Sequence, residues 1–227
     1  MIRLFVLVEG HTEESFVKGI LAPHLQRWEV FAVPIVVMTS KSASGKKTKG
    51  GGSWKNWRKD LTRLVGEQKG PGVRFTSMFD LYGLPKDFPE FSKHRSVADT
   101  SVRVELLERA MAAVVGDERL IPYIQRHEFE ALVLAGLDAL RALLEDADEI
   151  NAIRALERVV QATGPEDIND GPTTAPSKRL AGASPSYEKT VHGPLATEAK
   201  GLPALRATCP HFDAWVTKLE SLGERST

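Results

Sequence analysis

Apolar runs alternate with amphipathic segments along the first half of the chain. Ile2–Val8 is nearly continuous in apolar residues, which is typical of a strand covered on both faces. Residues 30–38 and 73–79 are rich in β-branched and aromatic residues, and Pro34 indicates that the first of these strands is interrupted or lies near an edge. Residues 120–124 predict a short fourth strand. This order predicts a parallel α/β sheet.

Helical segments are expected between and after these strands. Gly10 predicts a tight turn, after which Thr12 begins a helix that runs to about Trp28. Trp54–Glu67 is predicted to be helical, and residues 102–115 place apolar side chains at the spacing of an amphipathic helix. Further helices are predicted over residues 128–135, 137–144, 150–161 and 212–219.

The chain changes character in its second half. Residues 164–203 contain many Pro, Gly, Ser and Thr residues, which predict loops. We therefore expect an α/β core over residues 1–145 and a helical, loop-rich C-terminal extension over residues 146–227 that packs on it. With 42% hydrophobic and 26% charged residues, the composition is ordinary for a globular protein that buries a core.

Composition excludes several classes of protein. The single cysteine, Cys209, excludes an intramolecular disulfide framework and a cysteine-based zinc cluster, and it fits a cytoplasmic location. The apolar N-terminal run is too short for a membrane span, so no membrane association is expected. Lys plus Arg and Asp plus Glu both number 30, so any recognition of phosphate must come from a local patch.

Two carboxylates follow predicted strands. Glu9 ends the first strand and Asp80 ends the third, and ligands usually bind at the carboxyl ends of strands in an open α/β sheet. If the strands are neighbours, the two side chains form an oxygen-ligand site suited to Mg²⁺ or Mn²⁺. The alternatives are structural: Glu9 as a cap of the following helix, and Asp80 as a turn-forming residue.

The segment YIQRHEFEALVL places two more carboxylates after the fourth strand. Residues two apart do not share a helix face, so Glu128 and Glu130 are not expected to reach one metal together. Glu128 is preferred because it lies nearer the strand end. His127 is a possible acid, base or ligand, although a lone histidine at this position is more often structural.

Basic residues gather in two regions. Lys46, Lys47 and Lys49 lie in a Gly/Ser-rich loop that precedes Trp54 and Trp57, a combination that suits phosphate contacts and base stacking. The alternative is a solvated loop and two core tryptophans.

The second basic region is C-terminal. It contains Lys178 and Arg179 in APSKRL, and Lys189 and His192 in KTVHGP. These side chains are candidates for binding a phosphate, whose charge they would neutralise. Alternatively, they hold the C-terminal segment on the core.

Several motifs resemble known families. VLVEGHTEESFVKGIL resembles the opening strand and helix of Toprim domains, and Glu9 matches the glutamate that serves there as metal ligand or general acid/base. Over nearly the whole chain, VEGHTEE, SMFDLYGLPKDFP, YIQRHEFEALVL, INDGPTTAPSKRL, HGPLATE and CPHFDAW resemble, in this order, a bacterial Toprim-like family of unknown function, domain-of-unknown-function family 4276.

This resemblance implies metal-dependent phosphodiester chemistry. Toprim domains occur in topoisomerases, primases, recombination proteins and overcoming-lysogenization-defect nucleases. Similar families often accompany ATPases in phage defence, which implies a nuclease effector. The chain departs from the Toprim Asp-x-Asp motif, because Tyr82 stands where the second aspartate belongs. The further metal ligand is expected to be Glu128, with Glu13 as the next candidate.

The resulting hypothesis is a Mg²⁺-dependent (or Mn²⁺-dependent) nuclease that acts on nucleic acid, with DNA the expected substrate. Glu9, Asp80 and Glu128 would hold the metal, and Glu13 would orient or deprotonate the attacking water. Lys178 and Arg179 would balance phosphate charge. Two alternatives stay open: a non-catalytic subunit that partners an AAA- or ABC-type ATPase, and an enzyme that acts on nucleotides.

Overall fold

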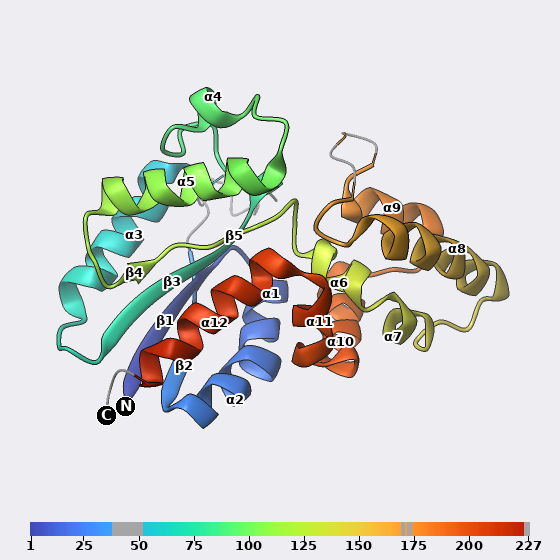
Figure 1. The fold of residues 1–227 in the computed structure, drawn as a ribbon, viewed down its shortest axis with the longest axis horizontal. Coiled ribbons are helices and arrows are strands. Elements are labelled where there is room, and N and C mark those ends of the chain that lie inside the picture. Colours follow the sequence, from blue (N-terminus) through green and yellow to red (C-terminus); the bar gives the residue numbers. More distant parts are fainter. Residues whose placement is uncertain (38–51, 169–170, 172–173, 225–227) are drawn as a thin grey trace, which may run out of the picture.

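A computed structural model of the chain describes residues 1–37, 52–168, 171 and 174–224. Its centre is a parallel sheet in the order β2-β1-β3-β4, with β5 also paired to β3 (Figure 1). The strands are β1 (Ile2–Val8), β2 (Val30–Val36), β3 (Val73–Asp80), β4 (Leu120–Ile121) and β5 (Ile124–Gln125). The predicted parallel α/β fold is therefore confirmed.

Helical segments make up most of the remaining described chain. In the first half they are α1 (His11–Phe16), a π-helical turn η1 (Val17–Leu21), α2 (Ala22–Leu25), the short 3-10 turn η2 (Gln26–Trp28), α3 (Trp54–Glu67), the 3-10 turn η3 (Leu81–Gly83), α4 (Phe91–His94) and α5 (Thr100–Val115). In the second half they are α6 (Glu130–Ala135), α7 (Leu137–Arg141), α8 (Ala147–Thr163), α9 (Pro176–Ala183), α10 (Lys189–Lys200), α11 (Leu202–Thr208) and α12 (Pro210–Glu224).

The apolar run of β1 is buried on both faces, as its sequence predicts. Leu4, Val6 and Val8 belong to a core shared with α1, α6 and α12, whereas Phe5 and Leu7 belong to a second core shared with α3 and α5. Figure 1 shows these two helical layers on opposite sides of the sheet. Alternating side chains of one strand thus hold both layers together.

Pro34 lies in β2, at the edge of the sheet, as expected. Because the Val37 N–H donates to the Val8 carbonyl, N–H groups at odd positions of β2 point toward β1, and the nitrogen of Pro34 points away from the sheet. The missing N–H therefore costs no ladder hydrogen bond.

The region from residue 164 to 203 is more helical than its composition indicates. It contains α9 and α10 in addition to turns. Pro176 lies in the first turn of α9, where its missing N–H has no partner to lose. The fourth predicted strand is divided into β4 and β5 around Pro122.

The last helix, α12, is part of the main core. Trp215 stacks on Tyr123 with ring centroids 4.2 Å apart, and its Nε1 donates a hydrogen bond of 2.9 Å to Thr76 Oγ1 on β3. The N-terminus of α12 is capped by Glu166, whose carboxylate accepts from the His211 and Phe212 N–H groups. The C-terminal segment therefore contributes directly to the centre of the sheet.

We expect Trp215→Ala to lower the free energy of unfolding by roughly 3–5 kcal/mol, because it removes a buried indole and leaves a cavity. Trp215→Phe should cost less, since the ring contact with Tyr123 is partly kept. Urea unfolding followed by circular dichroism measures both values. A Trp215→Ala variant within about 1 kcal/mol of wild type would contradict the assignment of α12 to the main core.

Candidate functional site

Three carboxylates surround one ammonium group beyond the carboxyl ends of β1 and β3, and a fourth is linked to them. Lys189 Nζ lies 3.0 Å from Glu130 Oε2, 3.5 Å from Asp80 Oδ2 and 3.9 Å from Glu13 Oε1. Glu9 is linked to the same group because its Oε1 accepts a 2.7 Å hydrogen bond from the Asp80 N–H. We call these five residues the carboxylate–lysine cluster.

Adjacent parallel strands bring Glu9 and Asp80 together. Val8 pairs with Met78 in the register of β1 and β3, so the two strands end side by side. Asp80 is held in turn by the Phe129 N–H, which donates to Asp80 Oδ1 at 2.8 Å just before α6 begins. Gly83 approaches the cluster from the following turn: a Cβ there would lie 2.7 Å from Glu9 Oε2. The absence of a side chain at Gly83 leaves room for the Glu9 carboxylate.

The cluster is largely buried. The side chains of Glu13 and Glu130 are 6% and 1% exposed, whereas Lys189 is 38% exposed and forms the solvent-facing side. Burial raises the pKa of Glu9 to about 7, although the Asp80 N–H opposes the shift. Burial also raises the pKa of Asp80 and Glu130, with Lys189 opposing it in both cases.

Lys189 stays charged in this setting. Burial by itself would lower its pKa, but Asp80, Glu130 and Glu13 together raise the pKa above its ordinary value. One ammonium does not neutralise four carboxylates, so the cluster has the charge and the hard oxygen donors that favour Mg²⁺ or Mn²⁺. Within the described residues, however, no three acidic, histidine or cysteine side chains are arranged closely enough to hold a metal ion. The donor chemistry fits a divalent metal, and binding would require Lys189 or the carboxylates to shift.

Glu130, rather than Glu128, contacts Lys189. Glu128 Oε1 accepts a 2.7 Å hydrogen bond from the Ser177 N–H in the first turn of α9, so it acts as a cap of that helix. The helix after β5 begins only at Glu130, and this delayed start turns Glu130 toward the cluster. The preference for Glu128 on the ground of its nearness to the strand is therefore corrected.

The predicted phosphate-binding cations of the C-terminal half do not all lie at the carboxylates. Lys178 is exposed. Arg179 Nε donates a 2.8 Å hydrogen bond to the Thr174 carbonyl, so this guanidinium group binds the backbone just before α9. His192 Nδ1 accepts from the Glu188 N–H at 2.8 Å, at the start of α10. Of the four C-terminal candidates, Lys189 is the one that contacts the carboxylates. Lys46, Lys47 and Lys49 lie outside the described residues.

Tyr82 and His127 form a pair beside Asp80. Tyr82 Oη lies 2.6 Å from His127 Nδ1, and His127 Nε2 lies 3.0 Å from the Glu166 carbonyl oxygen. Because a carbonyl only accepts, Nε2 carries the proton in the neutral ring and Nδ1 accepts from Tyr82. His127 is 1% exposed and has a φ of 63°, which agrees with the structural alternative for this histidine.

Trp54 and Trp57 are core residues and do not offer faces for base stacking. Trp54 packs edge-on against Phe88, and Trp57 packs against Phe79 with centroids 4.5 Å apart. Their exposed fractions are 6% and 2%. The core-packing alternative is therefore the correct one.

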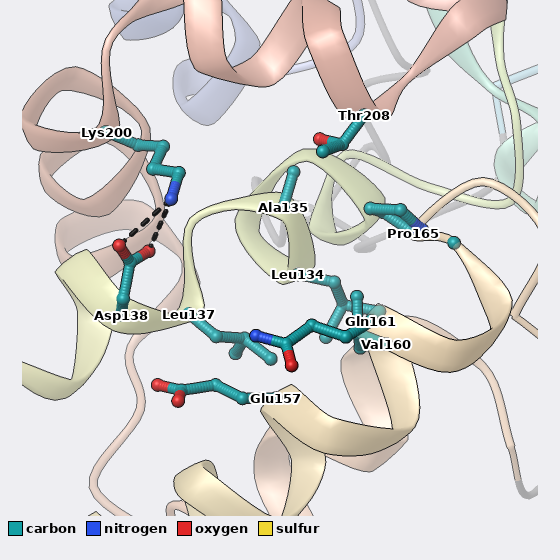
Figure 2. Close-up of a pocket in the computed structure, with 11 residues that line it drawn as sticks. Leu134, Ala135, Leu137, Asp138, Glu157, Val160, Gln161, Pro165, Lys200 and Thr208 are labelled. Carbon is teal, nitrogen blue, oxygen red and sulfur yellow. Dashed lines mark hydrogen bonds and ion pairs between the residues drawn. The ribbon is translucent and has the colours of Figure 1, made fainter.

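A separate pocket of about 450 Å³ lies among α6, α7, α8, α10 and α11 (Figure 2). Its walls include Leu134, Leu137 and Val160, and the Asp138–Lys200 ion pair closes one side. It shares no residue with the carboxylate–lysine cluster, which is the stronger candidate site because it combines buried charge with shifted pKa values. Among the described residues, no helix is long and apolar enough to cross a membrane.

The comparison with family models agrees with the motifs. A family model for a domain of unknown function, DUF4276, matches residues 8–220. No curated protein matches the chain. The fold is similar to the C-terminal region of the Burkholderia pseudomallei OLD protein, with 13% identity, a TM-score of 0.47 and coverage of 98% of this chain and 99% of that one. It is also similar to the C-terminal region of the Xanthomonas campestris pv. campestris OLD protein, with 14% identity, a TM-score of 0.32 and coverage of 96% and 98%.

The charge of Glu9 should make stability depend on pH in metal-free buffer. Between pH 4.5 and about 7 the folded protein binds more protons at Glu9 than the unfolded chain does, so stability contributed by the neutral carboxyl is lost as pH rises through this window. Glu9→Gln keeps an acceptor for the Asp80 N–H and removes the charge. We expect this variant to be more stable than wild type at pH 8, by up to about 3 kcal/mol, and nearly equal to it at pH 4.5.

Urea unfolding at several pH values in EDTA measures this difference. Asp138→Asn, which changes a more exposed carboxylate outside the cluster, is the control for a general loss of negative charge. A constant difference between Glu9→Gln and wild type across the pH range would contradict the assigned ionisation of Glu9.

Proposed function

The chain belongs to the DUF4276 family, and we propose that it is a metal-dependent nuclease that hydrolyses nucleic-acid phosphodiesters, with DNA as the expected substrate. The observation that carries the proposal is the carboxylate–lysine cluster. It places two buried and two part-buried acidic side chains, with one partly exposed ammonium group, at the carboxyl edge of a parallel sheet. The motif resemblance to Toprim domains supports the same chemistry.

Glu9 and Asp80 are the proposed metal-binding residues. One carboxylate oxygen of each is fixed by a backbone N–H: Glu9 Oε1 accepts from Asp80, and Asp80 Oδ1 accepts from Phe129. The second oxygen of each carboxylate is therefore held in place. Glu13, which contacts Lys189 as Asp80 does, would join them after a shift of its side chain or would orient a water molecule. Mg²⁺ or Mn²⁺, when bound, would supply Lewis-acid polarisation of a phosphate and a more acidic water.

Lys189 is the proposed phosphate-binding cation. It is the most exposed member of the cluster and stays protonated at neutral pH, so it faces an arriving phosphate with a full positive charge. In a complex with substrate, its ammonium group would contact a phosphate oxygen. Lys178 and Arg179 of α9 are further candidates for the same role.

The position of Lys189 also supports a second candidate function. An internal ammonium among the acids already compensates part of their charge without a metal. A chain that stays in this state would be a non-catalytic subunit, and the ATPase partner and defence role implied by the motif resemblance would then define its function. Metal binding separates the two candidates, because only the nuclease requires it.

We expect purified protein to cleave DNA with Mg²⁺ or Mn²⁺, and Glu9→Gln or Asp80→Asn to reduce the rate by at least about 100-fold while the fold is kept. Both changes preserve shape and remove a charged oxygen. Glu128→Gln is the matched control: it lies in the same region but caps α9, so its activity should stay within several-fold of wild type.

The assay compares supercoiled, linear and single-stranded DNA, together with RNA, in the presence and absence of EDTA. Isothermal titration with Mn²⁺ reports metal binding independently of cleavage. Metal binding lost in Glu9→Gln, together with cleavage, supports the nuclease. A folded wild-type protein that neither binds Mn²⁺ nor cleaves any substrate would favour the non-catalytic subunit.

A further inference from the structure

One face of α3 is strongly basic. Lys55, Arg58, Lys59 and Arg63 are all exposed on this helix, and Asp60 is the only acid between the first and the last of them. The overall charge of the chain is zero, so this concentration of positive charge is a local feature.

These side chains border a shallow, open depression on the surface, called here the α3 groove. The same four residues, with Trp54 and Asp87, border a concave region along α3. The carboxylate of Asp87 is already engaged: its Oδ1 accepts from the Trp54 N–H at 2.9 Å and its Oδ2 accepts from the Lys55 N–H at 3.3 Å. Asp87 thus caps the helix and leaves the basic side chains as the dominant charge of the groove.

Most of this positive charge is uncompensated by ion pairs. Arg63 lies 3.7 Å from Asp60, which satisfies one cation at the C-terminal end of the groove. Arg58 and Lys59 have no such acidic neighbour among the described residues. Side chains of this kind are available to bind an anionic ligand.

The N-terminal end of α3 lies at the carboxyl end of the sheet, on the opposite face from helices α1 and α6. Trp57 of α3 packs against Phe79, the residue before Asp80, and Trp54 packs against Phe88 in the loop that follows β3. The N-terminal end of α3 is therefore fixed beside the end of β3, whose last residue, Asp80, belongs to the cluster. Figure 1 shows α3 running from that end along the outside of the sheet.

We propose that the α3 groove binds the phosphodiester backbone of the nucleic-acid strand whose cleavage is proposed above. The inference rests on that function for its substrate class. The basic residues cover about 12 Å of helix, at 1.5 Å per residue, which spans about three to four phosphates of one strand of B-form DNA. Both tryptophans of α3 are buried, so the groove contacts phosphates without stacking on bases, and binding is independent of sequence.

The test compares two paired substitutions. Arg58→Gln/Lys59→Gln removes two charges from the groove, and Arg154→Gln/Arg158→Gln removes two exposed charges from α8 as the matched control. Fluorescence anisotropy with labelled single-stranded and double-stranded oligonucleotides of two unrelated sequences is measured in EDTA, over about 50–200 mM salt. Hydrolysis of bis(p-nitrophenyl) phosphate, a diester too small to reach along the groove, is measured with Mn²⁺.

The α3 pair should weaken oligonucleotide binding by about tenfold or more on either sequence and reduce the slope of log K against log salt by about 1–2. The α8 pair should leave both quantities near wild type, and neither pair should change hydrolysis of the small diester. An α3 pair with the affinity and salt slope of the α8 pair would overturn the proposal. Failure of the proposed function appears separately, as wild-type protein that hydrolyses neither DNA nor the small diester.

Discussion

The compensation of buried carboxylates by a single lysine is the interaction on which the arrangement of this molecule depends. Asp80, Glu130 and Glu13 approach Lys189 from three different elements, and Glu9 is joined to them through the Asp80 backbone. Without a cation, so many buried acids would be strongly unfavourable at neutral pH. The same group of charges therefore determines both the local stability of the sheet edge and the chemistry proposed for it.

The backbone around the cluster is organised to hold these charges. The Phe129 N–H binds Asp80, and the helix begins one residue later, at Glu130. Glu128 is turned away to cap α9, so neighbouring carboxylates serve two different elements. Such preorganisation is expected of a site that binds a charged ligand, since little rearrangement of the backbone remains to be made.

The sequence was sufficient to predict the features that depend on local pattern. Local pattern predicts the buried strand β1 from its apolar run and the edge position of Pro34 from its missing N–H. It also predicts that Glu9 and Asp80 lie at strand ends, because each directly follows or ends an apolar run. The contact of Lys189 with Glu130 depends on how α10 packs beside α1 and α6, which spacing along the chain does not encode. For the same reason, nearness to a strand end selected Glu128 wrongly: the direction of its side chain is decided by a hydrogen bond with α9.

The origin of Lys189 in the second half of the chain has a consequence for synthesis on the ribosome. Glu9, Glu13, Asp80 and Glu130 are all translated well before their cation. A nascent chain that ends before residue 189 can form the strands, but closing their carboxyl edge would bring the acids together without compensation. Compensation of these acids by the Lys189 ammonium group therefore becomes possible only after α10 has emerged.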